Sequence, residues 1–239
     1  MIVFDGMSLE AIAGVIVKDI QIGQIEYYPI TRPRAIRAGS EFILNRPGTR
    51  NVVITFSLLY EDIMSRQANL MAVSQWAKTD KEYKLELPGY PNRFLKAVCT
   101  RKPEASMRQW WESRLQIVFT CYDDPYWNSG KERTVNCGKE FYVGGDAVPL
   151  MRIERNLLSD ASDQSYTLDD KTISFSAIPA GQMKIDLNRQ TAIVKPSLQI
   201  SPEINIMQYY NINGKFLIPR TGTQIITGTG TIKYRERWQ

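Results

Sequence analysis

The sequence predicts a mainly β protein with two domains and one α-helix in the first of them. Apolar and charged side chains alternate with a period of two in several runs, for example residues 83–87 (YKLEL), which is typical of strands with one buried face. A clear 3.6-residue period occurs over residues 65–77. Beyond about residue 130 turn residues recur every 8–12 positions, a spacing that favours a β-sandwich.

The first domain is expected to contain several long strands and one tight hairpin. Residues 83–87 and 93–101 flank a segment with two prolines and a glycine, which cannot continue a strand and therefore forms a turn. Residues 111–121 place Leu115, Ile117 and Phe119 on one face and polar side chains on the other. Further strands are expected over residues 15–22, 34–38 and 51–60.

The predicted helix spans residues 65–77 and packs one face on the sheet. Ser65 is a candidate N-cap, because a hydroxyl group accepts hydrogen bonds from free N–H groups in the first turn. Trp76 is expected to anchor the helix in the core. The remaining apolar positions of the helix are Leu70, Met71, Val73 and Ala77.

A boundary is expected after the acidic and aromatic residues 122–127, so that residues 1–130 and 131–239 form the two domains. In the second domain, residues 183–187 and 191–194 predict a hairpin, and residues 228–234 predict a last strand. Trp238 follows alternating charges near the end of the sequence. We expect residues 234–239 to pack against another part of the protein, and the first domain is one candidate.

The sequence contains few residues or motifs suited to catalysis or to binding a metal or cofactor. The chain has no histidine, which removes the commonest general base and metal ligand. Its three cysteines lack metal-site spacing, and Cys99 and Cys121 lie in apolar runs typical of buried positions. Neighbouring aspartates, such as Asp123–Asp124 and Asp169–Asp170, are typical of turns. The glycine-rich residues 222–230 lack the GK[ST] ending of a phosphate loop. We therefore expect no enzymatic activity, no catalytic residue, no metal and no cofactor.

The charge pattern does not indicate a nucleic-acid arm or a membrane address. The formal net charge of +5 is spread along the chain without a run of five like charges. No signal peptide is recognisable, and no apolar run approaches the ~18 residues that a membrane span requires. We expect synthesis in a reducing cytoplasm.

Two features predict an assembly surface rather than an active site. The segment 27–50 combines arginines with prolines, and arginine pairs well with carboxylates across interfaces. The adjacent tryptophans 110 and 111 place one indole on each face of a strand, so one of them needs a partner. A solvated loop face is the alternative for the arginines. The predicted self-assembly residues are Arg32, Arg34, Arg46, Arg50, Trp110 and Trp111.

The order of several short motifs resembles the distal tail (Dit) proteins of long-tailed phages with non-contractile tails. They are residues 4–6 (FDG), 51–56 (NVVITF), 119–126 (FTCYDDPY), 227–230 (TGTG) and 232–238 (IKYRERW), which together extend over essentially the whole chain. One departure is Gln224, where many members have asparagine two places after the late glycine.

The resemblance implies a structural hub. The first domain would be a β-sandwich-like domain with a helix that forms a homo-hexameric ring, and the second a galectin-like β-sandwich. The ring would join the tail tube protein to tail-tip or baseplate proteins, and phage DNA would pass through its lumen without being read. The expected location is the tip of the virion tail after synthesis in the bacterial cytoplasm, with no membrane partner; a prophage-derived particle is the alternative.

Two other functions stay open at this level. A carbohydrate-binding module for attachment to the host cell wall would need an aromatic platform from Tyr142, Tyr166, Tyr209 or Tyr210. A tail-associated hydrolase is disfavoured by the missing histidine and by the absence of a convincing carboxylate pair.

Overall fold

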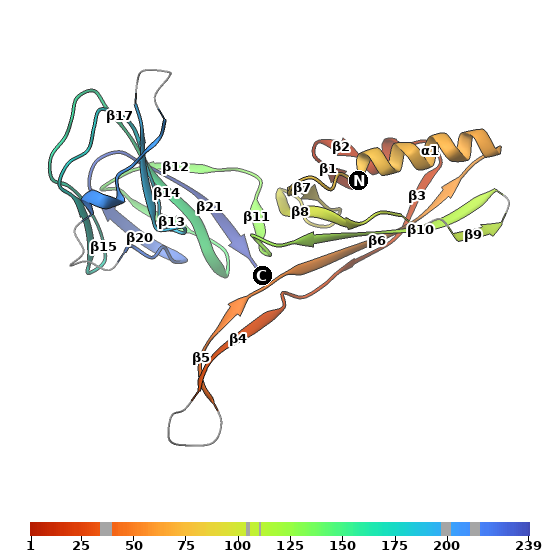
Figure 1. Cartoon of the computed structure of the whole chain (residues 1–239), viewed down its shortest axis with the longest axis horizontal. Helices are drawn as coiled ribbons and strands as arrows, with labels where there is room; N and C mark the ends of the chain where they lie inside the picture. Colours follow the sequence, from red (N-terminus) through yellow and green to blue (C-terminus); the bar gives the residue numbers. More distant parts are fainter. Residues whose placement is uncertain (34–39, 104–105, 110, 197–201, 211–215) are drawn as a thin grey trace. The chain divides into compact units, whose positions relative to one another are not determined.

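The computed structural model describes residues 1–33, 40–103, 106–109, 111–196, 202–210 and 216–239 (Figure 1). They form two compact units, residues 1–127 with Gln239, and residues 128–238. Both units consist mainly of strands, and the first contains the α-helix, so the predicted mainly β fold is confirmed. The strand predicted at residues 34–38 lies outside the described residues.

The first unit is built around two long central strands. β6 (Arg50–Leu59) pairs antiparallel with β10 (Glu112–Cys121) over its whole length, and β3 (Val15–Ile22) pairs with the other edge of β6. The other edge of β10 pairs with β8 and β9. The sheet then continues from β8 through β7 and β1 to β2. The shorter strands are β1 (Val3–Phe4), β2 (Met7–Ser8), β7 (Tyr83–Glu86), β8 (Arg93–Arg101) and β9 (Ser106–Gln109), and β11 (Trp127–Ser129) crosses the boundary between the two units.

Alternating side chains of β10 form the core of this unit, as predicted. Leu115, Ile117 and Phe119 are buried, and the ring of Phe119 lies 4.8 Å from Phe4 and 5.7 Å from Trp76. The Trp76 indole N–H donates to the Met7 carbonyl oxygen at 2.8 Å. The predicted role of Trp76 as a core anchor is confirmed, because the ring is buried and its one polar atom is satisfied.

The helix α1 spans Ile63–Trp76 and begins two residues before its predicted start. The predicted cap at Ser65 was wrong. Asp62 is the N-cap, and its carboxylate accepts from the Ser65 N–H at 2.7 Å while the Ser65 hydroxyl accepts from the Asp62 N–H at 3.1 Å. This reciprocal capping box places Ser65 in the first turn. Met71, expected on the apolar side, is 63% exposed. A short 3₁₀ turn covers Leu9–Ala11.

A two-stranded hairpin leaves the first unit between β3 and β6. It consists of β4 (Tyr27–Pro33) and β5 (Ser40–Pro47), which pair only with each other in the described chain and project away from the sheet (Figure 1). The sequence analysis placed arginines and prolines here but did not predict a hairpin.

The second unit is a sandwich of two antiparallel sheets. The larger has the order β19-β18-β17-β14-β21-β12, and the smaller β13-β20-β15-β16. Both contribute to one apolar core, for example Met183 and Ile232 from the larger sheet and Tyr166 and Phe175 from the smaller. The strands are β12 (Arg133–Asn136), β13 (Glu140–Val143), β14 (Ala147–Leu157), β15 (Gln164–Leu168), β16 (Lys171–Phe175), β17 (Gly181–Asp186), β18 (Thr191–Lys195), β19 (Ile204–Asn205), β20 (Gly222–Thr227) and β21 (Thr231–Trp238).

A hairpin and a turn of the second unit lie where the sequence predicted them. The predicted hairpin is confirmed by the pairing of β17 with β18. Asp169 adopts the left-handed conformation, with φ of 56°, in the turn between β15 and β16, which agrees with its predicted role in a turn. Residues 234–238 extend β21 and pair with β14 and β12, while Met207–Tyr209 form a 3₁₀ turn.

Candidate assembly surface

The base of the β4–β5 hairpin is fixed by backbone and side-chain hydrogen bonds. The Glu26 N–H donates to the Thr49 carbonyl oxygen at 2.9 Å, and the Gly48 N–H donates to the Glu26 carbonyl oxygen at 2.7 Å. The Glu26 carboxylate accepts from the Tyr28 hydroxyl at 2.8 Å and from the Thr49 hydroxyl at 3.2 Å. The hydrogen bond to Glu26 raises the pKa of Tyr28. The hairpin therefore leaves the sheet in a defined direction.

Glycine is required at position 48 for a steric reason. A Cβ atom there would overlap the ring of Tyr28 and lie about 3.1 Å from the Glu26 carbonyl oxygen. The ring of Tyr28 thus packs over bare backbone at the base of the hairpin.

The hairpin exposes large apolar side chains that its own chain does not cover. Ile43 has no partner residue on β4, and this bulge interrupts the pairing within the apolar run Phe42–Leu44. A two-stranded hairpin with both faces in water is marginally stable at best. The exposed fractions are 43% for Tyr27, 53% for Tyr28, 41% for Ile30, 59% for Phe42, 52% for Ile43 and 47% for Leu44.

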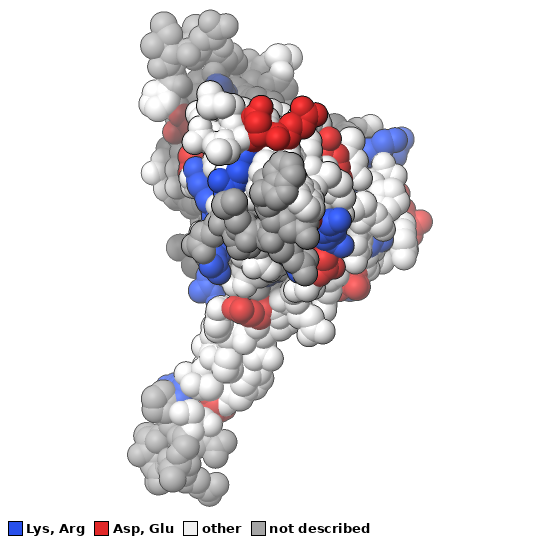
Figure 2. All heavy atoms as spheres, turned by 90° about the vertical axis from the view of Figure 1, so that its right-hand side faces the viewer, with Lys and Arg blue, Asp and Glu red and all other residues white. Residues whose placement is uncertain are grey.

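The described part of the hairpin carries three charged side chains, Arg32, Glu41 and Arg46. In Figure 2 it extends from the body of the first unit as a narrow arm. Pro29 and Pro33 of β4 lack the N–H group that a neighbouring strand would pair with, which discourages extension of the sheet along this edge. A partner would therefore contact the faces of the arm through side chains.

The predicted assembly residues occupy three different settings. Arg32 and Arg46 are exposed on the hairpin, opposite Glu41 and Tyr28 respectively, and neither forms an ion pair within the described part of the chain. Arg34 and Trp110 lie outside the described residues.

Trp111 and Arg50 differ sharply in burial. Trp111 is 43% exposed and precedes β10. Arg50 is the first residue of β6 and only 5% exposed, so it does not belong to a solvated loop face. The structure thus brings Arg32 and Arg46 together on one hairpin and separates Arg50 from them by burial.

Sequence reasoning missed the apolar side chains of this surface. The run Phe42–Leu44 has the composition of a buried strand, and its flanking prolines and arginines were the available signal that it lies outside the core. A second exposed apolar group lies on α1, where Ile63 is 73% and Met64 is 75% exposed.

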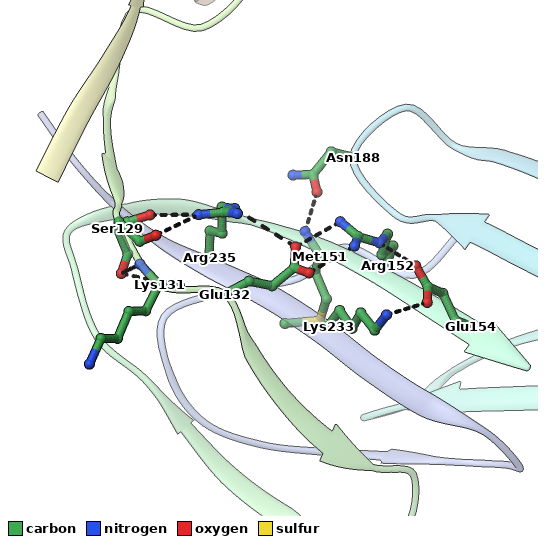
Figure 3. Close-up of polar contacts among 10 residues, drawn as sticks. Ser129, Lys131, Glu132, Met151, Arg152, Glu154, Asn188, Lys233 and Arg235 are labelled. Carbon is green, nitrogen blue, oxygen red and sulfur yellow. Dashed lines mark hydrogen bonds and ion pairs between the residues drawn. The ribbon is translucent and has the colours of Figure 1, made fainter. Parts of the chain in front are cut away.

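The second unit carries a network of five charged side chains on its larger sheet (Figure 3). Arg152 on β14 makes two parallel hydrogen bonds of 2.8 Å to the Glu132 carboxylate. The same arginine lies 2.6 Å from Glu154, which also pairs with Lys233 of β21 at 2.6 Å. Arg235 donates to the carbonyl oxygens of residues 129 and 130. The network therefore ties the segment before β12 to β14 and β21.

The protonation of this network follows from its contacts. Burial alone would raise the pKa of Glu154, but the hydrogen bonds from Lys233 and Arg152 outweigh it, and the pKa lies below its ordinary value. The pKa of Arg152 is raised because its two carboxylate partners outweigh the effect of burial. Arg152 and Glu154 are therefore both charged at neutral pH, and the ion pair of Glu154 with Lys233 joins β14 to β21.

The tyrosines considered for a sugar platform are dispersed. Tyr142 is 64% exposed on β13, whereas Tyr166 is fully buried in the core. Tyr210 is half-buried against Phe175, with ring centres 5.9 Å apart. The side chain of Tyr209 lies outside what the structure describes. Only Tyr142, among the described candidates, presents a largely open ring.

The cysteine and aspartate side chains that the sequence analysis singled out lie in different settings. Burial raises the pKa of the Cys121 thiol to about 12, so this cysteine stays protonated. Asp124 is buried and Asp123 exposed, so these neighbours do not share an environment. Among the described residues, no three histidine, cysteine, aspartate or glutamate side chains gather as a metal site. No helix in the described part of the chain has the length and apolar character needed to cross a membrane.

Comparisons with known proteins find similarity at the level of the fold. No protein-family model matches the sequence, and no curated protein is similar to it in sequence. The solved structure of the Dit protein (gp 19.1) of phage SPP1, described as a paradigm of the hub adsorption apparatus in phages that infect Gram-positive bacteria, matches with a TM-score of 0.72. The alignment covers 100% of this chain and 98% of that one at 14% identity.

Two weaker likenesses are to chains of the phage p2 baseplate in its activated conformation. With strontium the TM-score is 0.46, and with calcium it is 0.42, each at 8% identity over 94% of this chain and 91% of the other. The chain thus has the fold of the SPP1 Dit protein from end to end, which agrees with the family resemblance read from its motifs.

Proposed function

We propose that the protein is a structural, non-enzymatic hub of a phage tail, in which copies assemble into a ring that joins the tail tube to the tail-tip or baseplate proteins. The full-length likeness to the SPP1 Dit protein supports the hub role. The observation that carries the assembly is the β4–β5 hairpin, whose apolar faces have no cover within the described chain.

The proposed ring contains six copies and has an open lumen through which DNA passes without specific contacts. It belongs to the virion tail. The absence of a run of five like charges and the exposed apolar side chains of the hairpin agree with a contact made by shape and apolar burial rather than by recognition of nucleic acid.

Imaging of the purified protein tests this proposal. Negative-stain micrographs are expected to show rings, and light scattering is expected to give six times the mass of one chain at high protein concentration. A strict monomer at every concentration, alone and with the proteins encoded beside it in the phage genome, would refute the ring.

A second candidate function rests on Tyr142. Its ring is exposed on β13, in register with Thr223 of β20, and Ile225 beside it is 46% exposed. An exposed ring with neighbouring hydroxyl groups suits a carbohydrate, which would help attach the particle to the host cell wall. Binding on a glycan array that is lost on Tyr142→Ala would support this role, and an array without signal would reject it.

A further inference from the structure

A polar pocket of about 490 Å³ lies at the base of the β4–β5 hairpin. Its walls include the end of β3 and the following loop (residues 22–25), Tyr27 at the start of β4, and Arg50 at the start of β6. Tyr90, Trp127 and Gln239 complete them, and the rings of Tyr90 and Trp127 stack 4.2 Å apart at an interplanar angle of 14°. All of these residues belong to the first unit.

Arg50 is the unusual member of this pocket. Its side chain is almost fully buried, yet its Nε and Nη1 atoms have no hydrogen-bond partner. Burial lowers the pKa of Arg50, but a guanidinium remains protonated at neutral pH. Buried polar groups in folded proteins are nearly always paired, because an unpaired buried charge is costly. Two donor atoms of this buried cation thus lack a hydrogen-bond partner among the described residues.

No described residue, Gln239 in the pocket wall included, accepts a hydrogen bond from these two atoms. The segment that lines the pocket contains one acid, Glu26, and its carboxylate accepts from Tyr28 and Thr49 instead. No ion pair reaches Arg50 from any residue that the structure describes. The pocket walls include Tyr27 and Tyr90, whose hydroxyl groups are able to donate hydrogen bonds to an anion.

We propose that this pocket binds a carboxylate group through Arg50. The planar guanidinium matches a carboxylate in a two-pronged hydrogen bond, and a single cation balances one negative charge rather than the two of a phosphate. The carboxylate comes from one of two sources. It is either a free small carboxylate, or an Asp or Glu side chain of a second copy; only the latter rests on the proposed ring.

The two sources are separated by comparing three arginine variants with the wild type. Arg50→Met keeps the length of the side chain without its charge, and Arg50→Lys keeps the charge without the planar fork. Arg189→Met is the matched control, because Arg189 lies exposed in the turn between β17 and β18. Melting is followed in sodium acetate and in sodium chloride at equal ionic strength and neutral pH.

For a free carboxylate, we expect acetate to raise the melting temperature of the wild type and of Arg189→Met by a saturable shift of roughly 2 °C or more over chloride. Arg50→Met is expected to melt above the wild type in chloride, because the unpaired charge is gone, and to show no acetate shift. Arg50→Lys is expected to need roughly tenfold more acetate.

For a carboxylate of a second copy, we expect no acetate shift, but a loss of roughly tenfold or more in the self-association of Arg50→Met relative to Arg189→Met. The carboxylate proposal is overturned if acetate acts no better than chloride and Arg50→Met assembles like Arg189→Met. If Arg50→Met forms rings, the proposed function stands even though the carboxylate proposal fails. If acetate raises the melting temperature of a protein that never assembles, the carboxylate site stands and the proposed ring fails.

Discussion

Replacing Phe42, Ile43 and Leu44 together with serine removes the most exposed apolar run of the hairpin. These side chains are 59%, 52% and 47% exposed in the single chain, so about half of each remains to be buried by a partner. Full burial of such a side chain is worth about 1.5–3 kcal/mol. Half of that, summed over three side chains, gives roughly 2–4.5 kcal/mol of association free energy per copy, a loss of roughly 30- to 1,600-fold in affinity.

The same substitution is expected to leave the folded chain nearly as stable as before. The three side chains contact little of their own core, and surface changes of this kind usually alter the free energy of unfolding by less than about 0.5 kcal/mol. Leu158→Ser is the matched control, since Leu158 is 97% exposed on the second unit. It removes an apolar side chain without touching the hairpin.

Mass photometry or light scattering over a range of protein concentrations measures the outcome. The triple variant is expected to dissociate at concentrations where the wild type and Leu158→Ser are assembled, with an unchanged melting temperature. Assembly of the triple variant at wild-type affinity would refute the reasoning, because the hairpin faces would then not be the contact.

Three further predictions concern stability. Asp62→Ala removes the helix cap and is expected to lower the melting temperature of the first unit by roughly 2–4 °C, measured by circular dichroism. Trp76→Ala leaves a cavity against Phe119 and is expected to cost about 3–5 kcal/mol, measured by urea unfolding; a cost below about 1 kcal/mol would contradict the assigned packing. The pKa of Glu154 is depressed in the folded state, so its contribution is complete above the unfolded pKa and is lost as pH falls through the folded pKa. Glu154→Gln is therefore expected to lower stability at neutral pH and to reduce the loss on acidification below about pH 4.5, measured by melting as a function of pH; a pH profile identical to wild type would contradict this assignment.

The strands that were predicted correctly from the sequence are those that are buried by other residues of the same chain. β10 alternates apolar and polar residues because one face meets Phe4 and Trp76, and the period of two records that environment. The β17–β18 hairpin was equally visible, since its turn residues are local. The helix start was missed because Asp62 and Ser65 both suit a cap, and only the reciprocal geometry distinguishes them.

The ion-pair network around Arg152 could not be predicted from the sequence for a different reason. Glu132, Arg152 and Lys233 come from segments far apart in the sequence, and their meeting depends on the register between β14 and β21 and on the segment before β12. Charge patterning within one strand carries no information about such a register. The same holds for the unpaired state of Arg50, which depends on what its neighbours in space do not supply.

The hairpin exposes apolar side chains while a neighbouring arginine is buried, which is the reverse of the usual distribution. This bears on how a sequence encodes an assembly surface. The sequence analysis took the arginines of residues 27–50 as the contact groups, but Arg50 is buried while Phe42 and Leu44 are exposed. A run such as Phe42–Leu44 has the composition of a core strand because it needs a core, and its own chain does not provide one. If a second copy covers it, the hydrophobic effect that folds each unit also drives the association, without demanding charge complementarity. Arginines beside such a run then serve to keep the free chain soluble and to limit wrong pairing, which is a role that Arg32 and Arg46, exposed and without ion pairs in the described residues, are placed to fill.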